Sequence, residues 1–263
     1  FGTKVIGVNF AQLGEAYEQA DRAAAKKISD EWIGAAQKVV EPTREDIEKS
    51  AAMYLAMCKL LEQHQAQAIT VNCLGGFYGG HMSAYPCLGF MQLNNDGFIG
   101  GCEADQRSAI TMLLMTSLTG RPGFISDPVV DTSKKQIIYA HCVAPTKVFG
   151  PNGLSNPYHI RSHSEDRKGA CDRSLMPLGE MTTTLKFDAN QKKVILHQGV
   201  TVENVDEDMA CRNKLAVEVK GDVYKLLNEW DRWDWHRVTY YGDYKRAVYN
   251  MASLLGFEVV EEA

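Results

Sequence analysis

The chain has 263 residues, an ordinary globular composition and a formal net charge of −5 at neutral pH. This charge argues against nonspecific binding to nucleic acid or to anionic membranes, and no apolar run is long enough to span a bilayer. The seven cysteines form no Cys-x-x-Cys pair and mostly lie in apolar segments, which favours reduced, buried thiols. We therefore expect a cytoplasmic protein with neither a membrane nor a nucleic-acid partner.

The first 120 residues show the alternation of strands and helices that is typical of an α/β domain. Residues 4–10 form a short apolar run, which predicts a buried strand followed by a long helical region. Thr43 and Asp46 resemble a capping box at the start of the next helix. Residues 68–74 then predict a second buried strand. This order favours a parallel sheet with crossover helices.

Two carboxylates, Glu103 and Asp105, open a strongly apolar helix within residues 100–120. Gly120 lies in the position that glycine favours just after a helix. Because negative side chains are stabilised at a helix N-terminus, both acids can stay ionised. An ionised carboxylate suits a metal ligand or a general base. The alternative is that these acids only cap the helix.

From residue 121 the pattern changes to short strands with few helices, which predicts a β-rich, barrel-like domain over residues 121–263. A hairpin is expected around residues 188–190, where two alternating runs meet. The expected strands cover residues 122–127, 136–142, 181–187, 193–201, 214–219, 236–241 and 257–260, and the expected helices cover residues 222–230 and 243–255.

Residues 147–179 show no sustained period and predict a long loop. Stretches of this length in compact domains are often lids or binding loops. This loop carries Arg161, His163 and Glu165, a set that suits an anionic or polyhydroxylated ligand with Arg161 as its anchor. The alternative is a solvated surface excursion without a ligand.

Two histidines stand at strand ends, His141 after IIYA and His236 before RVTYY. A lone histidine among apolar residues is more often a hydrogen-bonded core group than a ligand. Metal sites nevertheless combine histidine with carboxylates from distant parts of a chain. Sequence spacing alone cannot bring Asp105 and His236 together.

Five segments follow one another in an order that resembles the L-fucose isomerase and L-arabinose isomerase superfamily, particularly its fucose isomerase-like members of unassigned activity. The segments are CEADQRSAITMLLMTSLTGRPGFISDP, IIYAHCVAP, HIRSHSE, LGEMTTTLKF and HRVTYYGDYKRAVYNMASLLGFEVV. The resemblance implies a subunit of two Rossmann-like domains and a β-rich C-terminal domain, of which this chain matches the second and third. It assigns residues 1–120 to a Rossmann-like domain and implies a homo-oligomer, a trimer or hexamer, with active sites between subunits.

The same resemblance implies a divalent cation, usually Mn²⁺, that holds two adjacent oxygens of a sugar substrate. Two acidic residues then move a proton between C1 and C2 through an enediol. By this comparison Asp105 and His236 bind the cation, and Glu103 or His141 handles protons. The loop residues Arg161, His163 and Glu165 would close over the substrate.

One departure from the family pattern changes the expected ligand set. The family has a glutamate some two dozen residues before its aspartate, and no glutamate precedes Asp105 at that distance. His81 lies at that distance, and histidine can bind a metal in place of glutamate, so we expect His81 as a third ligand. The sequence thus predicts a metal-dependent aldose–ketose isomerase. The alternatives are a metal-dependent lyase, epimerase or hydrolase on a related sugar, and a noncatalytic sugar-binding paralogue.

Overall fold

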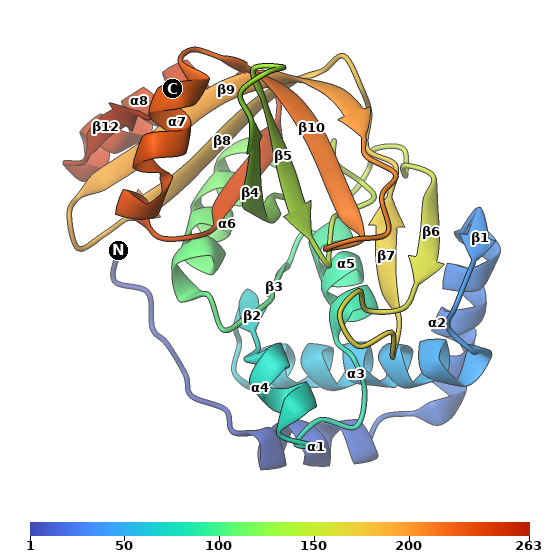
Figure 1. Cartoon of the computed structure of the whole chain (residues 1–263). Helices are drawn as coiled ribbons and strands as arrows, with labels where there is room; N and C mark the ends of the chain where they lie inside the picture. Colours follow the sequence, from blue (N-terminus) through green and yellow to red (C-terminus); the bar gives the residue numbers. More distant parts are fainter.

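A closed six-stranded β-barrel stands beside a group of helices in the computed structural model, which describes residues 1–263 (Figure 1). The helices are α1 (Phe10–Glu18), α2 (Arg22–Ala35), α3 (Arg44–Gln63), α4 (Cys73–Tyr78), α5 (Cys87–Asn95), α6 (Gln106–Thr119), α7 (Val223–Glu229) and α8 (Lys245–Leu255), with a short 3₁₀ helix η1 (Trp230–Trp233). The strands are β1 (Lys38–Val39), β2 (Ala68–Thr70), β3 (Ile99–Gly101), β4 (Phe124–Asp131), β5 (Gln136–His141), β6 (Tyr158–Arg161), β7 (Cys171–Ser174), β8 (Met181–Asp188), β9 (Lys193–Asn204), β10 (Asn213–Lys220), β11 (Arg237–Tyr241) and β12 (Glu258–Glu261). None of the helices combines the length and the apolar character needed to cross a bilayer.

The barrel runs in the order β10-β5-β4-β11-β8-β9, and pairing of β9 with β10 closes it. All six contacts around the ring are antiparallel, and β12 joins β9 in parallel outside the ring. The expected hairpin is confirmed, because β8 and β9 pair with Leu185 opposite Leu196. The prediction of a barrel-like β-rich part is therefore confirmed.

Alternating side chains give the barrel two different faces. One set, including Leu185 and Val238, packs with residues of α6 and α8, so this set points outward. The other set, including Tyr139 and Val217, packs with α7 and fills the interior. Helix α6 covers part of the outside of the barrel, and its first residues lie at the barrel rim. The division of the chain at residues 120 and 121 stays a prediction.

Closure of the barrel depends on a close approach at Gly199, which lies opposite Val219 on the closing pair of strands. A Cβ on Gly199 would lie 2.3 Å from Val217 Cγ1 and 2.5 Å from the backbone oxygen of Glu218. We expect Gly199→Ala to lower the free energy of unfolding by about 1–3 kcal/mol, the usual cost of overpacking. Urea denaturation measures this, with Gly14→Ala in α1 as the control, since nothing lies within 4 Å of its added Cβ. Equal stability of the two variants would contradict a tight closure.

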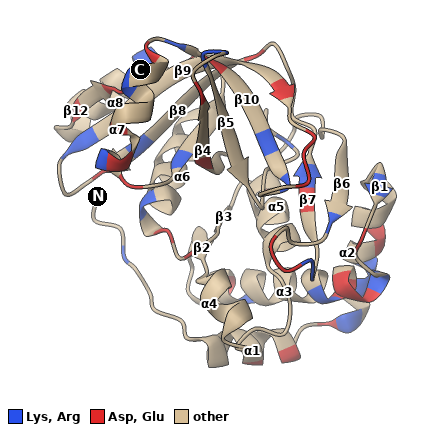
Figure 2. Cartoon of the chain, viewed as in Figure 1, with Lys and Arg blue, Asp and Glu red and all other residues tan.

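The N-terminal half is mainly helical around a core of 28 buried residues. The capping box predicted at Thr43 and Asp46 is confirmed at the start of α3. Parallel pairing in this region is limited to β2 with β3 and to β1 with β6. The structure therefore shows a mixed α/β arrangement, while a Rossmann-like sheet stays a prediction. Along α2 the basic residues Arg22, Lys26 and Lys27 precede the acidic residues Asp30 and Glu31, so both charges occur on this helix (Figure 2).

The strand predicted at residues 4–10 is wrong. Residues 1–9 have no strand partner and form an extended segment that leads to α1 (Figure 1). Phe1 stacks on Phe257 with ring centroids 5.1 Å apart, and Asn9 caps α1 through a capping box with Gln12. The run is apolar, yet it is not buried, and Val5 is 59% exposed. The strand predicted at 68–74 is shorter, since it ends at Thr70 and α4 starts at Cys73.

The prediction of one long loop over residues 147–179 is wrong in part. Strands β6 and β7 form an antiparallel pair within it, and β1 adds in parallel to β6. Each of the two strands has only four residues. A strand this short gives two alternations of burial at most, which is too few to reveal a period of two.

Strand β7 buries a carboxyl group, Asp172, which is fully inaccessible to solvent. Its Oδ2 accepts hydrogen bonds from the Ala144 backbone N–H and from Asn213 Nδ2, both at 3.2 Å, while Oδ1 has no partner. Burial outweighs these hydrogen bonds and raises the pKa of Asp172 to about 8. The folded protein therefore holds a proton that the unfolded chain has already lost above its ordinary pKa near 4.

Because the folded-state pKa is the higher one, Asp172 makes stability fall as pH rises from about 4 to about 8. The expected slope is at most about 1.4 kcal/mol per pH unit. We expect Asp172→Asn to remove this component, so that the difference in unfolding free energy between wild type and variant changes steadily across pH 5–8. Asp231→Asn, at an exposed position on η1, is the control. A difference that stays constant with pH would contradict the raised pKa.

Candidate active site

Four side chains from separate parts of the chain meet at the barrel rim beside the start of α6. Glu103 comes from the turn between β3 and α6, Asp127 from β4, His141 from the end of β5 and His236 from the residue before β11. His236 Nε2 lies 3.1 Å from Asp127 Oδ1 and 3.7 Å from Glu103 Oε2. His141 Nε2 lies 3.6 Å from Glu103 Oε1, and the two imidazole rings are 5.2 Å apart. We call these four residues the rim cluster.

The atoms of the rim cluster that face one another lack hydrogen-bond partners. His141 Nε2, His236 Nε2 and Asp127 Oδ1 are all buried without a hydrogen bond. Buried polar atoms normally have a partner, so three such atoms in one place require an explanation. Two imidazole nitrogens with two carboxylates form a donor set that suits Mn²⁺ and similar divalent cations. The ligand atoms of Glu103, His141 and His236 also all lie within 4.8 Å of one another.

The turn that carries Glu103 has an unusual backbone. Glu103 and Ala104 have φ values of 62° and 54°, in the left-handed region that residues other than glycine rarely adopt. Such strain of about 1–3 kcal/mol per residue persists where the surrounding structure enforces it, often at functional sites. Here the turn leaves the Glu103 side chain 36% exposed and facing both histidines. This geometry favours a functional role for Glu103.

Asp105 contacts the Nδ1 side of His236, whereas the unpartnered atoms of the rim cluster lie on its Nε2 side. It is the N-cap of α6, where its Oδ1 accepts the Ser108 backbone N–H at 2.9 Å. Its Oδ2 lies 2.9 Å from His236 Nδ1 and 3.9 Å from Lys186 Nζ. Both oxygens are therefore occupied, which does not support the expected role of Asp105 as a direct ligand. A carboxylate on the far nitrogen of a histidine fixes the ring orientation and the tautomer at a metal site.

Electrostatic interactions favour the charged forms of both Asp105 and His236. Burial would raise the pKa of Asp105, but the hydrogen bond with His236 and the charge of Lys186 hold it well below its usual range. Burial likewise opposes the charged form of His236, yet its hydrogen bond to Asp105 and the nearby carboxylate of Asp127 raise its pKa to about 9. His236 is therefore protonated at neutral pH unless a cation takes the place of that proton at Nε2.

The Nδ1 atom of His141, like that of His236, is engaged by a neighbouring side chain, in this case by a sulfur atom. Its Nδ1 lies 3.5 Å from Cys142 Sγ, and its Nε2 points at Glu103. Each histidine of the rim cluster thus has one nitrogen engaged by a neighbouring group and one nitrogen free toward the other members. This division is typical of histidines that bind metals.

The structure does not bring the remaining predicted site residues into the rim cluster. His81 is exposed and stacks on Phe10 with ring centroids 5.4 Å apart, so its expected metal role has no geometric support. Arg161 forms a bidentate ion pair with Glu41. Glu165 accepts a hydrogen bond from the Tyr78 hydroxyl at 2.6 Å.

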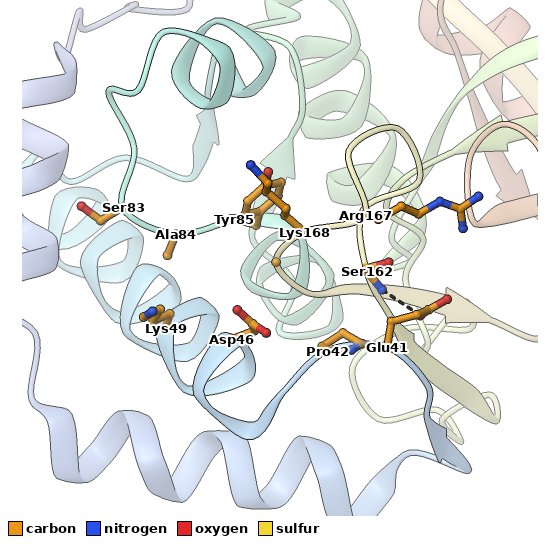
Figure 3. Close-up of a pocket in the computed structure, with 11 residues that line it drawn as sticks. Glu41, Pro42, Asp46, Lys49, Ser83, Ala84, Tyr85, Ser162, Arg167 and Lys168 are labelled. Atoms are coloured by element: carbon orange, nitrogen blue, oxygen red, sulfur yellow. Dashed lines mark hydrogen bonds between the residues drawn. The ribbon is translucent and has the colours of Figure 1, made fainter.

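The loop after β6 lines a separate polar cavity of about 340 Å³. Figure 3 shows Arg167 and Lys168 on one side of it and Lys49 of α3 on the other. The Ser162 backbone N–H donates to Glu41 at 3.1 Å across its edge. His163 of the same loop has its Nδ1 3.3 Å from Asp166 Oδ1, and its ring packs edge-on against Phe77. A ligand-binding role for this loop stays a prediction, with Arg161 already neutralised by acids.

Sequence reasoning missed Asp127. One signal was available, because Asp127 ends the buried run FIS and is followed directly by proline. An acid in that position interrupts an apolar strand and has to be satisfied locally. The alternation of β4 alone gave no reason to pair it with His236, which is 109 residues further along the chain (236 − 127).

Comparison with known proteins gives relatives that share one name. No protein-family model matches the chain. The chain is 23% identical to proteins named sulfoquinovose isomerase from Priestia aryabhattai and Priestia megaterium, over 92% of this chain and 55% of each relative. It is 20% identical to a protein of the same name from Clostridium sp. strain MSTE9, over 98% of this chain and 58% of that protein. The chain thus spans a little over half the length of these curated relatives.

Proposed function

We propose that this chain carries the catalytic centre of a metal-dependent aldose–ketose isomerase that acts on a sugar or sugar derivative. The observation that carries the proposal is the rim cluster, in which two acids and two histidines turn unpartnered atoms toward one another. The similarity to proteins named sulfoquinovose isomerase, spread over most of this chain, supports a sugar isomerase in particular.

Glu103, Asp127, His141 and His236 would hold a divalent cation, which we propose to be Mn²⁺. A cation of this kind polarises a carbonyl and stabilises the negative charge that develops on its oxygen. The protein contributes the orientation of the ligands. Asp105 holds Nδ1 of His236, and Cys142 holds Nδ1 of His141.

The two acids of the rim cluster are also the groups placed to move protons. A carboxylate takes the proton from C2 of an aldose and returns it to C1, while the proton of the C2 hydroxyl passes to the oxygen at C1. This sequence leaves the ketose with no net gain or loss of atoms. Glu103 suits the carbon-proton transfer, because it is the more exposed acid and lies between the two histidines.

With Asp127 as a ligand, the sequence no longer lacks the glutamate that the superfamily has some two dozen residues before its aspartate. Asp127, rather than Asp105, would be the family's aspartate, and Glu103 precedes it by 24 residues (127 − 103). The spacing then agrees with a glutamate some two dozen residues before the aspartate. It supports membership in the L-fucose and L-arabinose isomerase superfamily without any role for His81.

The substrate and the assembly belong to the proposal as well. The names of the relatives make sulfoquinovose, an anionic aldose, the first sugar to test. From the resemblance to the L-fucose and L-arabinose isomerase superfamily, we also propose a homo-oligomer, a trimer or hexamer, with active sites between subunits.

Two measurements on the purified chain test this function. Elemental analysis should find close to one equivalent of manganese or a similar metal in wild type, and His236→Ala should lose it. Incubation with sulfoquinovose in D₂O should give an isomer of unchanged heavy-atom composition with deuterium at C1 or C2. A product that is cleaved or hydrated would indicate a lyase or hydrolase instead. A protein that takes up no manganese would point to a noncatalytic sugar-binding paralogue.

A further inference from the structure

The sulfur atoms of Cys102 and Cys142 lie 3.6 Å apart beside the rim cluster, although 40 residues separate them in the chain. Cys102 follows β3 and Cys142 follows β5, so the fold and not the local sequence brings them together. Both thiols are free and buried, at 3% and 7% exposed. A disulfide bond is about 2.05 Å long, so the two sulfur atoms are in contact but not bonded. We call the two residues the thiol pair.

Each member of the thiol pair is the direct chain neighbour of a rim-cluster residue. Cys102 precedes Glu103, and Cys142 follows His141. Cys142 Sγ also lies 3.5 Å from His141 Nδ1, the ring nitrogen that faces away from Glu103. The turn after Cys102 is strained already, since Glu103 has a φ value of 62°. A movement of either sulfur atom is therefore passed on to a proposed metal ligand.

We propose that the thiol pair is a site of reversible oxidation, whose disulfide weakens metal binding at the rim cluster. The regulatory part rests on the proposed function, because it concerns the same ligands. The oxidant is a peroxide, which is small and can enter beside the 36% exposed side chain of Glu103. One sulfur attacks the O–O bond, which gives a sulfenic acid and water, and the second thiol then displaces a second water as the S–S bond forms. Two electrons and two protons pass from the thiols to hydrogen peroxide, which becomes two molecules of water.

The disulfide changes the rim cluster through distance, because the sulfur atoms have to approach by about 1.5 Å to form the bond. The backbone beside Cys102 is anchored to the end of β2. Thr70 Oγ1 donates to the Cys102 carbonyl at 3.2 Å, and the Ala104 N–H donates to the Val71 carbonyl at 2.9 Å. Metal–ligand distances are kept within about 0.2 Å, so even a small share of this approach displaces a ligand. Oxidation also removes the S–H hydrogen of Cys142, so that its sulfur can no longer donate a hydrogen bond.

Treatment of the reduced, metal-free chain with hydrogen peroxide tests the proposal. We expect the intact mass to fall by two hydrogen atoms, two thiols to become untitratable, and peptide mapping to find Cys102 joined to Cys142. Manganese titration of the oxidised chain should show at least about tenfold weaker binding, the smallest loss usual for a change in residues that support a ligand. Dithiothreitol should restore both the mass and the affinity.

Cys102→Ser should form no such disulfide and should keep its manganese affinity after peroxide, and Cys102→Ala gives the same comparison if the serine variant does not fold. Cys58→Ser is the matched control, because Cys58 is a free cysteine on α3, and it should respond to peroxide as wild type does. Absence of the disulfide in wild type, or a disulfide between other cysteines, overturns the proposal. A cross-linked chain with full manganese affinity overturns the regulation alone. A reduced chain that takes up no manganese overturns the proposed function and the regulation together.

Discussion

Asp127→Asn is expected to lower kcat/KM for sugar isomerisation by about 100- to 10,000-fold, the range usual for loss of a proton-transfer group. The variant keeps the size of the side chain but removes its negative charge beside His236, whose Nε2 is 3.1 Å away. Metal content should fall together with activity, because an amide is a poorer ligand than a carboxylate for a hard cation. Elemental analysis and a timed product assay on the same preparation measure both effects.

Glu103→Gln separates the two roles of the acids. If Glu103 moves the carbon proton, its variant should lose turnover by a similar factor, and exchange of deuterium into the sugar should disappear with it. Glu218→Gln, an exposed carboxylate on β10, should leave activity and metal content unchanged. Full turnover by Asp127→Asn or Glu103→Gln would exclude the rim cluster as the catalytic centre.

The sequence predicted local elements far better than the contacts between them. Most strands of the barrel and the helix that follows Asp105 were predicted within a few residues, because caps, turns and periodicity are local properties. The failure at residues 4–10 has the opposite cause. Whether an apolar run pairs with a strand depends on contacts far along the chain, and residues 1–9 pair with no strand although β2, which pairs with β3 alone, has a free edge.

The candidate site could be predicted only in part for the same reason. Glu103, Asp105, His141 and His236 were all singled out, yet Asp105 contacts Nδ1 of His236, and Asp127, which was not singled out, lies at its Nε2. Barrel closure brings β4, β5 and the start of β11 to one rim, and no short-range pattern encodes that closure. His81 was chosen by its distance along the chain, which says nothing about distance in space.

A second large effect is expected inside the barrel wall, where Arg237 and Glu262 form a fully buried ion pair. Arg237 donates to both carboxylate oxygens of Glu262 and lies over the ring of Trp230. Glu262 also pairs with His197 at 2.9 Å. We expect Glu262→Ala to lower the free energy of unfolding by about 3–5 kcal/mol, because a buried guanidinium is left without its counter-charge.

The neighbouring residue provides the control for this experiment. Glu261 pairs with Lys245 at 2.8 Å, but both side chains are more than 40% exposed. Glu261→Ala should therefore cost under about 1 kcal/mol. Urea denaturation of both variants makes the comparison, and similar losses would contradict a special cost for the buried pair. The double variant Arg237→Met, Glu262→Met should recover much of the loss, since it removes both charges together.

The same pair connects the barrel wall to the rim cluster, which gives the prediction a functional readout. Arg237 follows His236 directly and donates to the backbone oxygens of His236 and Asp234 at 3.2 and 3.0 Å. The segment that presents His236 is therefore anchored through Arg237 to Glu262. A folded Glu262→Ala protein should bind manganese more weakly than wild type, by about 10- to 100-fold, as for other residues that support a ligand. Glu261→Ala should bind it normally, and unchanged affinity in both variants would restrict the ion pair to a role in stability.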